Sequence, residues 1–184
     1  MSKILIIYAT KHGHTAKVAT RIADRLRSTG AAVDASDIAE HPRPDISGYD
    51  GVIVGASIHG GHHQREITEW VRHDADRLSL MPSALFSVSL TAADETDEAR
   101  AATRGYIDEL IDDTGWRPVV ATSFAGALQY LEYDFMTRLL MRLLMAHGHH
   151  DTDTSADHEY TDWAAVDRFA DECRAMVSLP VTLG

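Results

Sequence analysis

The chain has 184 residues, of which 45% are hydrophobic and 24% charged, as expected for a single globular domain over residues 1–184. Its formal net charge of −11 argues against nonspecific binding to nucleic acid, because the phosphates would repel such a surface. The lone cysteine, Cys173, excludes an internal disulfide, and no apolar run approaches the roughly 20 residues of a membrane-spanning helix, so we expect a cytoplasmic protein.

The chain alternates short apolar segments with amphipathic ones. Short runs rich in β-branched residues predict buried strands, at residues 4–9, 31–37, 51–56, 84–90 and 118–124. Apolar residues repeat at helical spacing between them, which predicts helices at residues 15–28, 64–78, 96–114 and 162–177. This alternation is typical of an α/β protein with a parallel sheet and helices on both faces.

Five such strands fit a doubly wound sheet with the strand order 2-1-3-4-5. In that order, ligands bind outside the carboxyl ends of the strands, where the winding of the sheet reverses direction. The loops at residues 9–15, 56–63 and 90–96 are therefore expected to form a binding site.

The first of these loops, residues 10–15 with the sequence TKHGHT, leads from a buried strand directly into a helix. Such a turn directs backbone N–H groups and the positive end of a helix dipole at one point, which suits a phosphate. Thr10 and Thr15 add hydroxyl donors, and Gly13 allows a close approach of the backbone. The loop lacks both the Gly-Lys-Ser/Thr of a P-loop and the three glycines of dinucleotide-binding folds, so FMN fits best. The alternative is a plain turn whose threonines only cap the helix.

The N-terminal segment MSKILIIYATKHGHT resembles the flavodoxin signature, a strand followed by Thr/Ser-x-x-Gly-x-Thr. Five further segments resemble those of the flavodoxin-like, quinone-dependent protoporphyrinogen IX dehydrogenases of bacterial haem synthesis, in the same order and spacing. They are GASI at 55–58, MPSA at 81–84, SVSL at 87–90, GAL at 126–128 and YTDW at 160–163.

The resemblance implies a flavodoxin-like fold and FMN-dependent dehydrogenation of protoporphyrinogen IX to protoporphyrin IX, with electrons passed to a membrane quinone. Two alternatives remain. One is a flavodoxin that only carries electrons, which the acidic surface favours. The other is a flavodoxin-fold NAD(P)H:quinone reductase.

The resemblance also implies that residues 57–63 and 87–93 flank the isoalloxazine ring. The predicted cofactor-binding residues are Thr10, Lys11, His12, Gly13, His14, Thr15, Ser57, Ile58, His59, Gly60, Gly61, Ser87, Val88, Ser89, Leu90, Thr91 and Gly126. The catalytic residue stays unassigned. His59, His62 and His63 are candidates for accepting a proton, and the alternative is that they are solvated loop histidines. Neither loop contains Trp or Tyr, so the sequence does not identify a residue that stacks on the flavin.

An insertion at about residues 125–159 separates the last strand from the last helix. Residues 134–146 predict a short helix, with an apolar face of Phe135, Leu139, Leu140, Leu143 and Leu144. This face suits packing on the core, a homodimer contact, or peripheral contact with the inner face of the cell membrane.

Charged and metal-binding side chains near the expected site lead to two further expectations. Lys11, Arg65, Arg138 and Arg142 are candidate cations for the carboxylates of a porphyrinogen substrate. Histidines and aspartates are frequent in residues 147–158, but a flexible polar loop rarely holds the fixed geometry of a metal site. No metal is therefore assigned.

Overall fold

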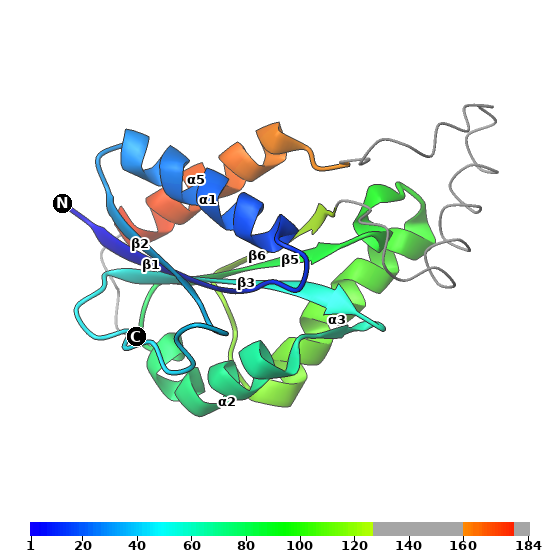
Figure 1. Cartoon of the computed structure of the whole chain (residues 1–184), viewed down its shortest axis with the longest axis horizontal. Helices are drawn as coiled ribbons and strands as arrows, with labels where there is room; N and C mark the ends of the chain where they lie inside the picture. The colour runs from blue at the N-terminus through cyan, green and yellow to red at the C-terminus, as the bar shows by residue number, and fades with distance from the viewer. Residues whose placement is uncertain (127–159, 179–184) are drawn as a thin grey trace.

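A computed structural model describes residues 1–126 and 160–178 of the chain. In these residues a sheet lies between two pairs of helices, as Figure 1 shows. The strands are β1 (Lys3–Ala9), β2 (Ala32–Asp37), β3 (Gly51–His59), β4 (His62–His63), β5 (Ser83–Ser89) and β6 (Val120–Ala125). The helices are α1 (His14–Ser28), α2 (Arg65–Ser79), α3 (Asp97–Thr114), α5 (Trp163–Ser178) and the short 3-10 helix η1 (Thr91–Ala93). Among the described helices, none is long and apolar enough to cross a membrane.

The main sheet is parallel and has the order β2-β1-β3-β5-β6. This is the predicted doubly wound order, which is thereby confirmed. The predicted element boundaries agree with the structure to within two residues at all ends except the carboxyl end of β3.

The prediction of five strands was wrong in one respect, because β3 continues to His59 and then turns back as β4. His62 and His63 of β4 pair antiparallel with β3. The turn consists of Gly60 and Gly61, both with positive φ (59° and 89°), as two-residue hairpin turns require. The sequence SIHGGHH shows no apolar alternation, so periodicity alone did not identify this short hairpin.

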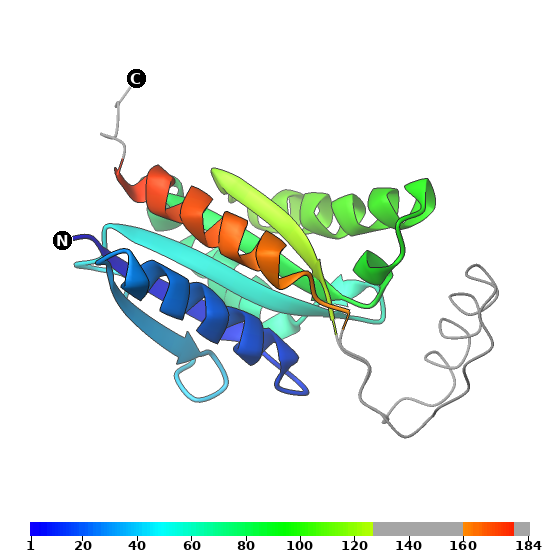
Figure 2. The same cartoon turned by 90° about the horizontal axis from the view of Figure 1, so that it is seen from above.

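Large apolar side chains fill the spaces on both faces of the sheet. Along β1, Ile4 and Ile6 pack on the side of α1 and α5, whereas Leu5 and Ile7 pack on the side of α2 and α3. This division follows from the alternation of side chains along a strand. Helices α1 and α5 lie side by side across one face, which is clearest in Figure 2. The core thus holds the sheet rigidly between its helices.

Two bidentate ion pairs join α5 to α1. Arg21 pairs with Asp167 and Arg25 with Asp171, at N–O distances of 2.6–2.9 Å. The guanidinium groups are about half exposed, so each pair contributes little to stability. These pairs set how α5, the helix that follows the insertion, is aligned along α1.

Gly55 allows an aromatic cluster to form above β3. A Cβ atom at this position would lie 2.1–2.7 Å from three ring atoms of Phe86. The Phe86 ring in turn packs against Phe124 and Phe169, with centroid distances of 6.1 Å to each. The ring has no free space to move into, because Phe86 is fully buried.

We therefore expect Gly55→Ala to lower the free energy of unfolding by about 1–3 kcal/mol, the usual penalty for overpacking. Urea denaturation followed by circular dichroism measures this change. Gly105→Ala in α3 is the control: its Cβ would meet nothing within 4 Å, and alanine favours a helix, so stability should rise slightly. Adding Phe86→Leu should recover part of the loss. Strict additivity of the two substitutions would contradict the proposed clash.

Candidate functional site

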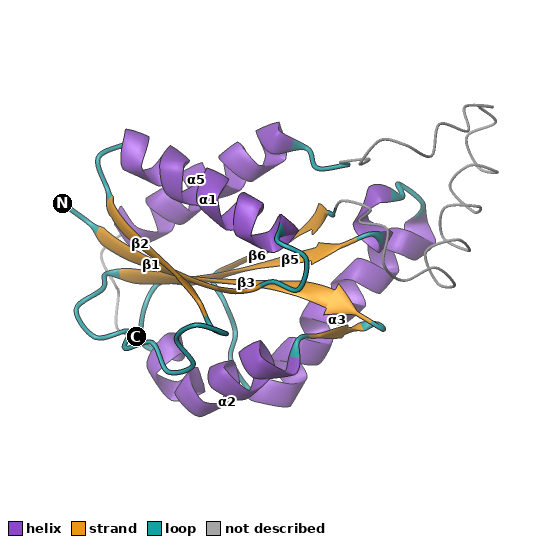
Figure 3. Cartoon of the chain, viewed as in Figure 1, coloured by secondary structure: helices purple, strands orange, loops and turns teal. Residues whose placement is uncertain are grey.

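The carboxyl ends of β1, β3 and β5 open onto one cleft, at the end of the sheet where the strand arrows point in Figure 3. Its walls come from the loop after β1, the β3–β4 hairpin, the segment from β5 into η1, and single residues of α3 and the end of β6. The lining residues are Thr10, Lys11, His12, His14, Thr15, Ser57, Ile58, His59, Gly60, Gly61, Val88, Ser89, Leu90, Thr91, Tyr106 and Gly126. The cleft therefore lies where the doubly wound order predicts a ligand.

The loop after β1 folds back on itself before α1 begins. The backbone N–H of Gly13 donates to Oγ1 of Thr10 at 2.9 Å, and Gly13 takes a φ of +82° that favours glycine. Helix α1 has no side-chain cap and no acidic residue in its first turn. Helix α3, in contrast, is capped by Thr96 and has two acidic residues there. The start of α1 therefore keeps its positive end available to an anion, with the Thr15 hydroxyl beside it.

The β3–β4 hairpin holds the ring of His59 through a chain of two hydrogen bonds. Oγ of Ser57 donates to Oε1 of Gln64 at 2.9 Å. Nε2 of His59 lies 3.1 Å from the same Ser57 oxygen. A serine hydroxyl has one hydrogen, so His59 Nε2–H is the donor of this second bond. Across the cleft mouth the His12 ring meets that of His59 edge to face, with a centroid distance of 5.7 Å.

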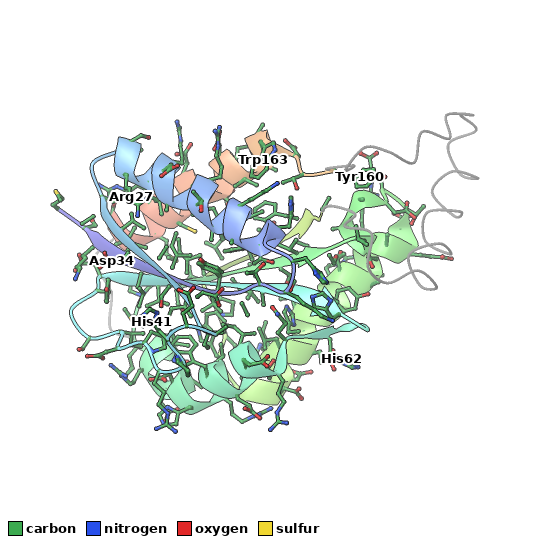
Figure 4. All side chains as sticks on the ribbon, viewed as in Figure 1. Arg27, Asp34, His41, His62, Tyr160 and Trp163 are labelled. Carbon is green, nitrogen blue, oxygen red and sulfur yellow. The ribbon has the colours of Figure 1, made fainter. Side chains whose placement is uncertain are left out.

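The other two histidines of the hairpin lie outside the cleft lining. His62 is exposed, and its Nδ1 is 2.7 Å from Oε1 of Glu109 in α3. In Figure 4 it lies on the side of the sheet that α2 and α3 cover. His63 Nε2 is 2.6 Å from Oγ of the buried Ser87, and burial, followed by the neighbouring His62, lowers the pKa of His63 to about 4. The structure thus separates the three candidate proton acceptors, and only His59 faces the cleft.

Tyr106 completes the wall on the β5 side. It lies within the helix predicted at residues 96–114, is half-buried and lines the cleft. Its hydroxyl lies 3.4 Å from Oγ1 of Thr91. The helical period cannot distinguish a residue that faces the core from one that faces a cleft beside the core. The polar tip of tyrosine was the only signal available.

The two ends of the insertion are joined beside the cleft. Oγ1 of Thr161 donates to the carbonyl of Ala125 at 2.7 Å and therefore accepts from Nε2 of His14, which is also 2.7 Å away. The N–H of Tyr160 lies 3.4 Å from the carbonyl of Gly126. Tyr160 and Trp163, labelled in Figure 4, mark where the chain returns. These contacts link the start of α1, at His14, to the base of the insertion. No local sequence pattern revealed them.

Of the predicted cofactor-binding residues, all except Gly13 and Ser87 line the cleft. Gly13 shapes the loop through its backbone, whereas Ser87 bonds to His63 beneath the cleft. Lys11 lines the cleft, but Arg65 lies outside it and pairs with Glu69. The predicted face of Phe135, Leu139, Leu140, Leu143 and Leu144 lies outside the described residues. The same holds for Arg138, Arg142 and the histidine-rich residues 147–158.

A family model described as a flavodoxin domain matches residues 5–155. Solved flavodoxins share the fold. A short-chain flavodoxin associated with a non-canonical PDU bacterial microcompartment superposes with a TM-score of 0.60 and 16% identity, covering 97% of this chain and 100% of that one. A Streptococcus pneumonia TIGR4 flavodoxin gives a TM-score of 0.54 and 19% identity, covering 95% and 99%. The fold and the cleft thus define a protein of the flavodoxin class.

Two relatives narrow this class. Protoporphyrinogen IX dehydrogenase (quinone) of Escherichia coli strain K12 is 34% identical over 97% of this chain and 98% of its own length. The protein of the same name from Leishmania major is 37% identical, covering 95% of this chain and 75% of its own length. The chain belongs to this family of flavodoxin-domain oxidoreductases, the quinone-dependent protoporphyrinogen IX dehydrogenases.

The lowered pKa of His63 predicts a pH dependence of stability. As pH falls below about 6.5, His63 takes up a proton in the unfolded chain but stays neutral in the folded one until about pH 4. The free energy of unfolding should therefore fall with pH across this window. His63→Gln should reduce the fall, measured by urea denaturation near pH 7.5 and near pH 5. His41→Gln, which removes an exposed histidine, is the control. An equal pH dependence in His63→Gln and wild type would show that His63 does not cause the fall in stability.

Proposed function

We propose that this protein binds FMN in the cleft and dehydrogenates protoporphyrinogen IX to protoporphyrin IX, passing the electrons to a membrane quinone. The observation that carries the proposal is the convergence of the loop after β1, the β3–β4 hairpin and the β5 segment in one cleft, in a chain of this family. The surrounding residues suit the chemical parts of FMN in turn, from its phosphate to its ring.

The phosphate would lie against residues 10–15. Thr10 and Thr15 supply hydroxyl groups there, and the uncapped first turn of α1 supplies backbone N–H groups and a positive dipole. No carboxylate from the first turn of α1 opposes an anion at this point. The donor set therefore fits a monophosphate.

The ring would lie between the hairpin and the β5 segment. Ser57, Gly60, Gly61, Ser89 and Gly126 are small, so backbone groups can approach a flat ligand closely. A Cβ at Gly126 would come within 3.4 Å of Val88 Cγ1, so a larger residue would tighten this wall. When bound, FMN supplies the hydride acceptor and the redox link to the quinone.

The substrate would reach the ring past the tip of the hairpin. Gly60 and Gly61 carry no side chains there, which leaves room for a flat macrocycle. The side chains of His59 and Tyr106 are flat surfaces against which an apolar ring system can pack. Lys11 supplies a cationic side chain to the cleft lining, which suits a substrate carboxylate.

Thr10→Ala combined with Thr15→Ala should raise the Kd for FMN at least about tenfold, because hydrogen bonds to a charged group are worth about 1.5–3 kcal/mol. Quenching of flavin fluorescence measures binding. Riboflavin, which lacks the phosphate, should bind both proteins alike, and Thr20→Ala, an exposed position further along α1, should bind FMN normally. Equal loss of FMN and riboflavin binding would show that the phosphate is not held at residues 10–15.

Protein reconstituted with FMN should convert porphyrinogen to fluorescent porphyrin without oxygen when a soluble quinone is present. Porphyrin emission over time measures the rate, with an enzyme-free control for spontaneous oxidation. No gain above this control would overturn the dehydrogenase function and favour an electron carrier, which the net charge of −11 suits. Flavin reduction by NADH would instead favour a nicotinamide-dependent reductase.

A second arm of this experiment tests contact with a membrane, which rests on the apolar pattern of residues 134–146. A long-chain quinone in liposomes replaces the soluble one. Leu140→Asp should slow turnover with this quinone and leave turnover with the soluble quinone intact. Leu80→Asp is the matched control, because Leu80 is exposed at the opposite end of the sheet. Equal rates for both variants with both quinones would exclude this surface as a membrane contact.

A further inference from the structure

The Ser57–Gln64 pair controls which nitrogen of His59 carries the proton. Gln64 Oε1 accepts from the Ser57 hydroxyl, so this hydroxyl oxygen is left as an acceptor for His59 Nε2–H. A neutral imidazole carries one N–H, and its other nitrogen holds a lone pair. His59 is therefore fixed with Nε2 protonated and Nδ1 as its basic atom, on a ring that lines the cleft.

We infer that His59 is the catalytic base of the proposed dehydrogenation, and that Ser57 and Gln64 are positioning residues that fix its tautomer. This inference rests on the proposed function. It adds the identity of the proton acceptor, which neither the sequence nor the family assignment provides.

The reaction needs such a base for its balance. The first two-electron oxidation of a porphyrinogen breaks one C–H bond at a methylene bridge and one N–H bond at a neighbouring pyrrole, and new π-bonds form between them. Three such oxidations, with the shift of one proton from a bridge carbon to a nitrogen, give the porphyrin, in which four C–H and two N–H hydrogens have been lost in all. Bound FMN, the oxidant of the proposed function, would accept the hydride from carbon, and the quinone would reoxidise it. The proton from nitrogen needs an acceptor, and His59 Nδ1 takes it and returns it to solvent at the cleft mouth.

Other titratable groups of the described cleft are less suited to this role. Lys11, His12, His14 and Tyr106 line the cleft with His59. Lys11 is assigned to a substrate carboxylate in the proposed function, and the Tyr106 hydroxyl lies 3.4 Å from Oγ1 of Thr91 on the β5 side. Nε2 of His14 donates to Thr161, which ties that histidine to the base of the insertion. His12 contributes an aromatic edge against His59, and the two-bond support through Ser57 and Gln64 belongs to His59.

A tautomer measurement tests the positioning without any turnover. In the full chain labelled with 15N-histidine and free of FMN, two-bond 1H–15N correlation spectra should show His59 with its proton on Nε2. Ser57→Ala should give a mixture of tautomers, and Ser57→Thr, which restores a hydroxyl, should return the wild-type pattern. A His59 protonated on Nδ1 in the wild type, or unchanged by Ser57→Ala, would overturn the inference.

Turnover tests the catalytic role. His59→Gln should lower kcat about 100-fold, the usual contribution of a general base, and remove the acid limb of the pH profile while FMN still binds. Ser57→Ala should lower kcat and shift that limb, and Ser57→Thr should restore both. His62→Gln is the matched control, because His62 lies outside the cleft lining and pairs with Glu109.

The outcomes separate the two proposals. An active wild type whose His59→Gln variant keeps its kcat and its pH profile overturns the inference and leaves the proposed function standing. A wild type that does not oxidise porphyrinogen overturns the proposed function, and with it the catalytic role of His59. The tautomer spectra then decide the positioning by Ser57 and Gln64 on their own.

Discussion

The backbone hydrogen bonds that pair β1, β3 and β5 in parallel place Ala9, Ala56 and Ser87 in one row across the sheet. The carboxyl ends of parallel strands lie at the same end of the sheet, so the chain must leave each strand on the same side of the molecule. The helices that follow return the chain to the other end of the sheet, where the next strand begins. Three segments far apart in the sequence therefore meet without any direct attraction between them. The cleft is a consequence of this pairing.

Side chains become smaller along β3 and β5 toward the carboxyl ends of these strands. In β3, Val52, Ile53 and Val54 lie in the buried middle, and Ala56 and Ser57 follow toward the carboxyl end. In β5, Leu85 and Phe86 are followed by serines at 87 and 89. Bulky residues hold the layers together, while small ones leave space and polar atoms at the strand ends. Stability and binding are thereby assigned to different parts of the same strands.

The sequence predicted most of the fold because its elements depend on local patterns. The loop at residues 10–15 could be recognised because a strand, a glycine turn and a helix follow one another directly. The strand order followed from the alternation of five strands with helices. Tyr106 and Thr161 were missed, since their positions depend on how α3 and the start of α5 pack against distant segments. His59, His62 and His63 looked equivalent in the sequence. The structure separates them by their contacts, because His59 bonds to Ser57 in the cleft lining, His62 to Glu109 of α3, and His63 to the buried Ser87.

The joined base of the insertion has a consequence for how freely this part of the chain can vary. Ala125 bonds to Thr161, and Gly126 meets Tyr160, so the chain leaves and re-enters the domain at one point. The entropic cost of closing a loop grows only with the logarithm of its length, about 0.6 kcal/mol for each doubling. Lengthening the segment between these residues therefore costs the domain little stability. The joint between Ala125–Gly126 and Tyr160–Thr161 is therefore a position at which the length of the chain can change while the cleft stays the same.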